Sequence, residues 1–356
     1  MLIISMRFKG LESLVSGIKK AIATLGVGLA LALPAKATEY EIIKLVPPDP
    51  NCNFSNVYSI NDNGIVLGSY GQIKDNPQRG DPDPVLWTKR FMYNDGVYRE
   101  PNIPIGKINN WGDILAGSMV YKIDESIDIG FSGIDLNNKG EVLGEEFLYS
   151  DGEIIDVNVS IGYYFKTRSI NDKSQVVGYL IQDHHYGFLW EDGVTTRING
   201  LWKAFDINNN RTIVGQYEYH PPKLYPGLWR DGVAIQLPGG PGSAEAINDL
   251  EQVVGNTSVS ARPFIYENEE TTFLDTLIPK DSGWTRLYGV KDINNKGQIV
   301  GYGDYEENGE THTYAFLMNP KPKTLTADSN NDGIVNGFDL AELGNQWLEK
   351  EDWYGE

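Results

Sequence analysis

A nine-residue stretch, Ile60-Asn61-Asp62-Asn63-Gly64-Ile65-Val66-Leu67-Gly68, returns six more times along this chain. The further copies carry their first Asn at positions 109, 137, 171, 208, 248 and 294. The mean spacing of the seven copies is about 39 residues, which is typical of repeat architectures. The chain is therefore expected to fold as a series of similar structural units rather than as one irregular domain.

Each copy has the chemistry of a tight turn between two strands. An apolar residue ends the first strand, and the Asn and Asp side chains bend the chain by bonding their own backbone. Gly64 supplies the positive φ that a tight return requires, and the β-branched or aliphatic residues after it favour a second strand. The last glycine, Gly68, permits a close backbone approach or a bulge.

A second turn follows most copies and has the strongest short-range hairpin signal, Asp-Gly between two apolar runs. It occurs at Asp95-Gly96, Asp151-Gly152, Asp192-Gly193 and Asp231-Gly232. Residues 264–266 and 316–318 are degenerate copies of the strand before this turn, with altered turns. The interval between Asn109 and Asn137 is the shortest, and the hairpin signal is missing from it.

Two turns and three or four short strands per unit, with no long amphipathic helix between them, indicate an all-β fold. Four strands in about 40 residues is the content of a β-propeller blade, and a unit this small must stack on its neighbours. We therefore predict a β-propeller of six or seven blades over residues 38–320. Residues 40–46 form a candidate strand that is placed to complete the last blade.

The repeat resembles the HAF-type bacterial extracellular repeat over about residues 56–320, because the turn motif is followed by Phe-Leu-Trp, as at Phe188-Leu189-Trp190. The chain departs from the His-Ala-Phe unit of that family, which only Tyr314-Ala315-Phe316 and Tyr186-Gly187-Phe188 approximate. The resemblance implies a bacterial extracellular repeat protein and no particular activity.

Composition excludes several functions. The 356 residues have a net charge of −19, which argues against nucleic acid as the main partner, because phosphate binding needs a basic surface. A single Cys excludes an internal disulfide framework and a cysteine-rich zinc site.

Residues 1–37 have the layout of a secretory signal peptide. Basic residues precede an uncharged stretch at residues 21–33, and the small-x-small triplet Ala35-Lys36-Ala37 follows. Thirteen apolar residues are too few to span a bilayer comfortably, so an uncleaved membrane anchor is the less favoured alternative. We predict cleavage after Ala37 and a mature chain without a membrane span that is extracellular, periplasmic or held at the cell surface.

The end of the chain carries a calcium-binding pattern. After a linker at residues 321–325, a twelve-residue loop matches the EF-hand register of oxygen ligands, with Gly333 at the sharp turn. The predicted ligands are Asp328, Asn330, Asp332, the backbone carbonyl of Ile334, and Asp339. Asn336 would act directly or through water. A helix is expected after the loop, with Leu340, Leu343 and Trp347 on one face.

This loop and helix resemble one half of a type I dockerin over residues 326–349, within a predicted tail at residues 326–356. The resemblance implies calcium as the cofactor and a cohesin-like extracellular protein as a partner. Dockerins usually pair two such repeats, whereas one is visible here. Gly337 and Phe338 stand where well-studied members carry a small hydroxyl pair, so calcium binding is the firmer implication.

Two functions remain open from the sequence. The first is a secreted, monomeric, non-catalytic repeat protein that binds an extracellular protein or polysaccharide. The alternative is a polysaccharide-active hydrolase or lyase on the propeller, although no nucleophile elbow or zinc-protease motif is present and no catalytic residue can be assigned. The adjacent pair His184-His185 would point to opposite faces if it lay in a strand, which argues against a shared metal, and a pair in a loop is the favoured interpretation.

Two residue sets allow both a structural and a binding interpretation. The seven motif Asn residues either hold turns, which we favour, or form a ligand-binding ring on one face. The tryptophans either stack on sugars or, as we expect for most of them, fill the blade core. They are Trp111, Trp190, Trp202, Trp229 and Trp284.

Overall fold

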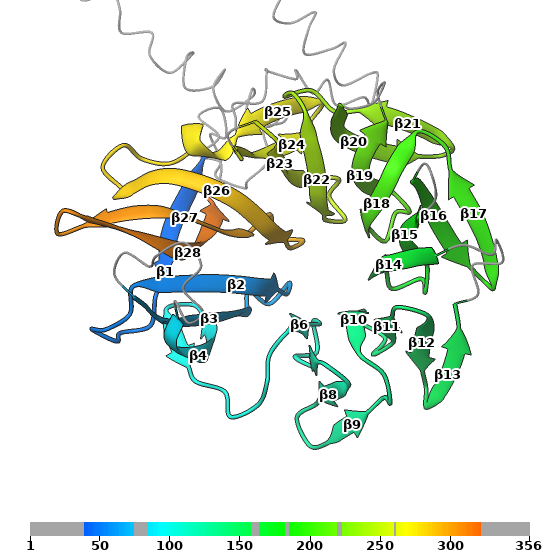
Figure 1. The fold of residues 1–356 in the computed structure, drawn as a ribbon, viewed down its shortest axis with the longest axis horizontal. Coiled ribbons are helices and arrows are strands. Elements are labelled where there is room, and N and C mark those ends of the chain that lie inside the picture. Colours follow the sequence, from blue (N-terminus) through cyan, green and yellow to red (C-terminus); the bar gives the residue numbers. More distant parts are fainter. Residues whose placement is uncertain are drawn as a thin grey trace, which may run out of the picture. The chain divides into compact units, whose positions relative to one another are not determined.

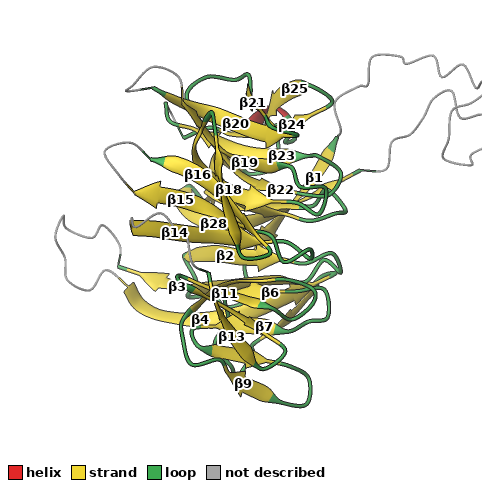
Figure 2. Ribbon diagram, turned by 90° about the vertical axis from the view of Figure 1, so that its right-hand side faces the viewer, coloured by secondary structure: helices red, strands yellow, loops and turns green. Residues whose placement is uncertain are grey.

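The computed structural model describes residues 39–74, 85–157, 164–181, 185–218, 223–259 and 261–321, which belong to one compact unit from Glu39 to Lys321. The predicted signal peptide and the predicted calcium loop and helix lie outside the described residues. Within the described part, strands dominate, and the only helix is a single short 3₁₀ turn, η1 (Leu274–Thr276), shown in red in Figure 2. No helix there is both long enough and apolar enough to cross a membrane.

The strands form seven blades of four around a common axis, which confirms the predicted propeller and sets its blade number at seven (Figure 1). Neighbouring strands within a blade are antiparallel, and the last and first blades join into one eight-stranded sheet through a parallel pair, Phe54 opposite Thr313. Blades 1 and 2 consist of β2 (Phe54–Ile60), β3 (Val66–Ile73), β4 (Val85–Asn94) and β5 (Val97–Arg99), and of β6 (Lys107–Ile108), β7 (Ile114–Ala116), β8 (Met119–Tyr121) and β9 (Ser126–Asp128). Blade 3 consists of β10 (Gly133–Leu136), β11 (Val142–Gly144), β12 (Phe147–Ser150) and β13 (Glu153–Asp156). Blade 4 consists of β14 (Tyr164–Ile170), β15 (Val176–Ile181), β16 (Tyr186–Glu191) and β17 (Val194–Ile198).

The remaining blades follow the same order. Blade 5 consists of β18 (Leu201–Ile207), β19 (Ile213–Glu218), β20 (Leu224–Arg230) and β21 (Val233–Gln236). Blade 6 consists of β22 (Gly242–Ile247), β23 (Val253–Thr257), β24 (Pro263–Glu267) and β25 (Glu270–Phe273). Blade 7 consists of β26 (Trp284–Ile293), β27 (Ile299–Glu307), β28 (Glu310–Pro320) and the N-terminal strand β1 (Tyr40–Leu45).

The N-terminal strand closes the ring. β1 pairs antiparallel with β28 over its whole length, from Tyr40 opposite Pro320 to Leu45 opposite Ala315. The backbone N–H of Lys321 also donates to the carbonyl of Glu39 at 2.7 Å, so the two ends of the propeller chain meet. The prediction that residues 40–46 complete the last blade is confirmed, and it explains why the strand at residues 316–318 has no hairpin turn after it.

The two predicted turn types are present, with one correction. At Asp192-Gly193 both residues have positive φ, 50° and 79°, as a type I′ hairpin requires, and the other three Asp-Gly turns share this geometry. Blade 2 does contain a hairpin, because β8 and β9 pair across a turn closed by the N–H of Lys122 and the carbonyl of Glu125, 2.8 Å apart. Its turn contains no Asp-Gly pair, so the sequence gives no hairpin signal there although the hairpin itself is present.

The hydrophobic core lies between adjacent blades rather than inside any one of them. Between blades 4 and 5, for example, Val177 and Leu189 pack against Leu201, Ile213 and Trp229. This arrangement follows from the size of the unit, because a single four-stranded sheet buries its faces only against its neighbours. Trp190, Trp229 and Trp284 are buried in such contacts, which confirms the core interpretation for these three tryptophans.

Candidate functional site

The innermost strand of every blade ends at the repeat motif, and the first Asn of the motif is buried in all seven blades. In blade 4, the Oδ1 atom of Asn171 accepts the backbone N–H groups of Lys173 and Gln175, both at 3.0 Å. The same pair of bonds recurs in the other turns, so these side chains hold the turns, as the structural interpretation predicts.

The same Asn residues also join the blades to one another. The Nδ2 atom of Asn171 donates to the carbonyl of Asn208 in blade 5 at 2.9 Å, and Asn294 of blade 7 donates to the carbonyl of Asn61 in blade 1 at 2.9 Å. Bonds of 2.9–3.2 Å complete the circuit through all seven blades. We call this closed circuit the Asn ring; its members are Asn61, Asn109, Asn137, Asn171, Asn208, Asn248 and Asn294.

A second closed circuit is built by the next residue of each motif. The backbone N–H of Asp172 donates to the Oδ1 atom of Asn209 at 2.9 Å, and each blade repeats this bond to its neighbour until Asn295 donates to Asp62 at 2.7 Å. The members of this Asx ring are Asp62, Asn110, Asn138, Asp172, Asn209, Asp249 and Asn295. Its carboxylates accept from amide groups of the same ring, for example Asp172 from Asn138 and Asn209 at 3.0 Å.

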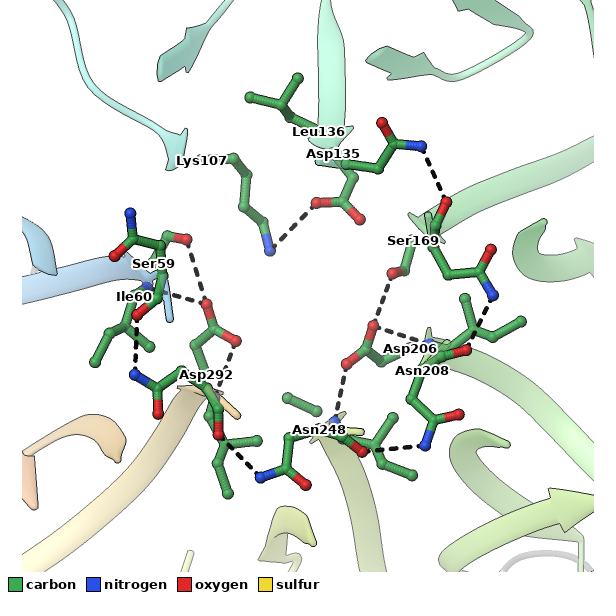
Figure 3. Close-up of a pocket in the computed structure, with 18 of the residues that line it drawn as sticks. Ser59, Ile60, Lys107, Asp135, Leu136, Ser169, Asp206, Asn208, Asn248 and Asp292 are labelled. Atoms are coloured by element: carbon green, nitrogen blue, oxygen red, sulfur yellow. Dashed lines mark hydrogen bonds and ion pairs between the residues drawn. The ribbon is translucent and has the colours of Figure 1, made fainter. Parts of the chain in front are cut away.

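Both rings line one end of a central channel that encloses a cavity of about 610 Å³. Deeper in the channel, two residues before the Asn ring, the side chains alternate between carboxylates and small groups (Figure 3). Blades 3, 5 and 7 contribute Asp135, Asp206 and Asp292, blades 1, 4 and 6 contribute Ser59, Ser169 and Ala246, and blade 2 contributes Lys107.

Each of the three carboxylates bonds the inner strand of the next blade. Asp135 accepts the N–H of Ile170 at 3.0 Å, Asp206 that of Ile247 at 2.9 Å, and Asp292 that of Ile60 at 3.1 Å. Asp206 also accepts the Ser169 hydroxyl at 2.7 Å. Because seven is odd, the alternation cannot close, and the remaining blade supplies Lys107, whose ammonium lies 3.7 Å from Asp135 (Figure 3).

The channel perturbs the acidity of these groups. Burial, with a further contribution from the charge of Asp135, raises the pKa of Asp206 to about 7. Burial likewise raises the pKa of Asp292, and the nearby Asp135 carboxylate raises the pKa of Lys107. The channel interior therefore holds an ion pair, Lys107 with Asp135, and a buried carboxyl group, Asp206, whose pKa lies well above that of an exposed aspartate.

Towards the other end of the channel, the inner strands carry cations. Arg168 and Lys291 line the cavity three residues before the Asn ring, and Lys203 lies five residues before it. Each lies over an aromatic ring: Arg168 over Phe205 at 5.3 Å, Lys203 over Tyr179 at 4.9 Å and Lys291 over Tyr302 at 5.6 Å. We call Arg168, Lys203 and Lys291 the cationic rim.

The other candidates from the sequence are two tryptophans, the histidine pair and the calcium ligands. Trp111 is 79% exposed beside the Asx ring, with its indole N–H donating to the carbonyl of Asn138 at 2.7 Å. Trp202 is half-buried and packs edge-on against His185, 5.1 Å between ring centroids, while His184 lies outside the described residues. The predicted calcium ligands Asp328, Asn330, Asp332, Ile334 and Asp339 also lie outside them, so calcium binding stays a prediction.

The cationic rim and the alternating carboxylates were not identified from the sequence. Their signal was present, since the residues stand at fixed offsets before the motif Asn. It becomes visible only when the repeats are aligned by blade. Among the described residues, no group of three or more His, Cys, Asp and Glu side chains is arranged to hold a metal ion.

Comparison with known proteins gives similarity at the level of the fold alone. No family model matches the chain, and no curated protein sequence matches it. Among solved structures, it is similar to a protein provisionally assigned as a gluconolactonase, at 9% identity over 79% of this chain and 92% of that one, with a TM-score of 0.38.

Two further structures are similar in the same limited sense. The extracellular domain of a hybrid two-component system of B. thetaiotaomicron matches at 12% identity over 78% of this chain and 39% of that one, with a TM-score of 0.44. The β-propeller domain of the Trilobed protease from Pyrococcus furiosus matches at 12% identity over 76% and 83% of the two chains, with a TM-score of 0.33. Similarities this distant carry no information on function.

Proposed function

We propose that this chain is a secreted, non-catalytic binding protein whose propeller presents a ligand site at one mouth of its channel. The observation that carries this proposal is that the channel carboxylates form hydrogen bonds between blades. Asp135, Asp206 and Asp292 each accept a backbone N–H from the neighbouring blade, so the acids of the channel cavity serve to join blades. The signal-like residues 1–37 support secretion, and the repeat resemblance supports an extracellular role.

Binding at the channel agrees with the rigidity of the scaffold. The Asn ring and the Asx ring fix the inner strands against one another around the whole circle, so side chains on these strands are held in place before a ligand arrives. Preorganised side chains lose little conformational entropy on binding. The predicted calcium tail would then serve display or attachment, with a cohesin-like protein as the partner that its resemblance implies.

The alternative, a polysaccharide hydrolase or lyase, is favoured by one observation. A carboxyl group with a pKa of about 7 inside a cavity, as at Asp206, is what a general acid requires near neutral pH. We give it less weight because both oxygens of Asp206 already accept hydrogen bonds, from Ser169, Ile207 and Ile247.

The two functions are separated by one measurement. The exported protein is incubated with a panel of neutral and acidic polysaccharides, and reducing ends and unsaturated products are followed over a day. We expect no product, together with retardation of the protein in gels that contain its ligand. The Asp206→Asn variant keeps the shape of the side chain. If the unmodified protein forms product and this variant does not, the enzymatic function is supported and the binding proposal is wrong.

A further inference from the structure

The cationic rim differs from several other positively charged groups of the described residues, which have carboxylate partners: Lys107 pairs with Asp135, Arg211 with Glu191 and Arg262 with Asp275. Arg168, Lys203 and Lys291 form no ion pair within the part of the chain that the structure describes, although Asp and Glu outnumber Lys and Arg by 49 to 30. These three cations are thus available to an external anion.

Two of the rim cations, Arg168 and Lys203, also act on each other. The pKa of Lys203 is lowered by its burial and by the charge of Arg168, and Arg168 also opposes the charge of Lys107 in the channel. Like charges held this close repel, and the repulsion is relieved when an anion binds between them. Among the described charged groups lining this part of the cavity, Glu245 of blade 6 is the acidic one, and it accepts a hydrogen bond from Ser243.

The aromatic partners narrow the class of anion. Phe205, Tyr179 and Tyr302 lie beneath the cations and orient them, and Phe205 and Tyr302 also line the cavity. Rings of this kind stack against the apolar faces of sugars, whereas the cations bind carboxylate or sulfate groups. Deeper in the channel the cavity is lined by three acidic side chains, Asp135, Asp206 and Asp292, so we infer that an anionic ligand lies across the mouth rather than inside.

From these contacts we propose that the cationic rim binds an anionic polysaccharide, carboxylated or sulfated, laid across the channel mouth on blades 4, 5 and 7. This inference rests on the proposed binding function and names its ligand class. Nucleic acid is the disfavoured polyanion, because three cations on a chain of net charge −19 neutralise few phosphates.

The test uses the full exported chain and a charge-matched pair of variants. In Arg168→Gln/Lys291→Gln, two rim cations are removed. In the control Lys173→Gln/Lys296→Gln, two exposed cations are removed from the motif turns at the opposite mouth. The probes are polygalacturonate, its methyl ester, dextran sulfate, dextran and an oligothymidylate, measured by titration calorimetry at low and at physiological salt.

We expect binding of polygalacturonate or dextran sulfate that is weakened about tenfold or more in the rim variant and less than about twofold in the control. The methyl ester and dextran should bind at least about tenfold more weakly than their charged counterparts. Binding of polygalacturonate indicates recognition of carboxylate groups, and binding of dextran sulfate indicates recognition of sulfate groups. Thermal unfolding of each variant, and recovery of affinity in Arg168→Lys/Lys291→Arg, show that the loss is not a folding defect.

Several results would overturn the ligand class. These are equal losses in the rim and control variants, equal binding of the neutral polymers, oligothymidylate binding as tight as that of the acidic glycans, or no binding of either charged glycan. None of them is a turnover measurement. Failure of this inference is therefore distinguishable from failure of the non-catalytic proposal, which is decided by product formation.

Discussion

Two glycines of blade 4 serve different physical purposes. Gly193, in a hairpin turn, has a φ of 79° and open space where a Cβ atom would project. Gly178, the last residue of its motif, lies in a strand opposite a bulge between Thr167 and Ser169, and a Cβ atom there would lie 2.0 Å from the carbonyl oxygen of Lys166. The first glycine is needed for backbone conformation and the second for close approach.

This difference predicts different costs for the same substitution in one blade. Gly193→Ala should lower the free energy of unfolding by about 1 kcal/mol, the strain of a left-handed Ala. Gly178→Ala should cost about 3 kcal/mol or more, because backbone must move to admit the methyl group. Denaturant unfolding of both variants checks the ratio, and equal costs would contradict the close-approach explanation.

The raised pKa of Asp206 predicts how stability depends on pH. A carboxyl group whose folded pKa of about 7 exceeds its unfolded value of about 4 binds its proton more tightly in the folded state. Its contribution is fully present below pH 4 and is lost as the pH rises towards 7. Wild-type protein should therefore lose stability relative to Asp206→Asn over this interval, and parallel stability profiles of the two proteins would argue against the shift.

Local turn chemistry was predictable from sequence, whereas the bonds between blades were not. The i+2 and i+4 bonds of each motif Asn depend only on its own turn, and Asx chemistry anticipates them. The donation from Asn208 to the carbonyl of Asn248 depends on a neighbour 40 residues away, which no single turn encodes. The hairpin of blade 2 was missed for a similar reason, since β8 and β9 are joined without an Asp-Gly pair.

Substitutions within one turn should show how much a motif Asn contributes beyond an ordinary turn residue. Asn208→Ala removes the acceptor for the N–H groups of Asn210 and Thr212 and the donor to Asn248, so we expect a loss of about 3 kcal/mol of unfolding free energy.

The matched control is Asn210→Ala in the same turn. The side chain of Asn210 is exposed and donates to the carbonyl of Asp249 at 2.9 Å, so its loss should cost less than about 1 kcal/mol. A control as destabilised as Asn208→Ala would mean that the Asn ring contributes little beyond ordinary turn stability.

Over the whole propeller, sequence reasoning gave the architecture and the closing strand but left the blade number between six and seven. The absence of an Asp-Gly signal for the hairpin of blade 2 caused that ambiguity. The cationic rim was not found because its members, Arg168, Lys203 and Lys291, are unremarkable in their own repeats. They form a cluster only because the ring brings blades 4, 5 and 7 to one channel mouth.

The meeting of Glu39 and Lys321 predicts that the chain tolerates circular permutation. A chain of residues 39–321 whose ends are joined by a short linker and whose new termini lie between Asp151 and Gly152 should keep the unfolding temperature of the unpermuted segment to within a few degrees. Deletion of β1 should lower that temperature far more, because β28 loses its partner strand. A deletion that melts like the intact segment would contradict closure by β1.

The tail beyond the propeller carries the calcium prediction. Asp328, Asp332 and Asp339 bring three carboxylates into one loop, so a cation should relieve their repulsion and order the helix that follows. We expect a heat of binding with a dissociation constant roughly in the micromolar to millimolar range.

Asp328→Ala should abolish this heat, and Asp352→Ala, beyond the loop, should leave it unchanged. If the unmodified protein shows no heat of binding at millimolar calcium, the metal assignment is wrong and the tail is an acidic segment.

Closure by the N-terminal strand also imposes an order in time. β1 is the first strand to emerge during synthesis, yet its partner β28 ends at Pro320, so the ring must wait, open at blade 7, until nearly the whole propeller has been made. The predicted cleavage after Ala37 lies two residues before β1, so we expect a leader that is still held by the export machinery to keep this strand from its place. Removal of the leader would then allow β1 to pair with β28, which is the final folding step. A precursor that is not cleaved should accumulate as an open ring that is sensitive to protease.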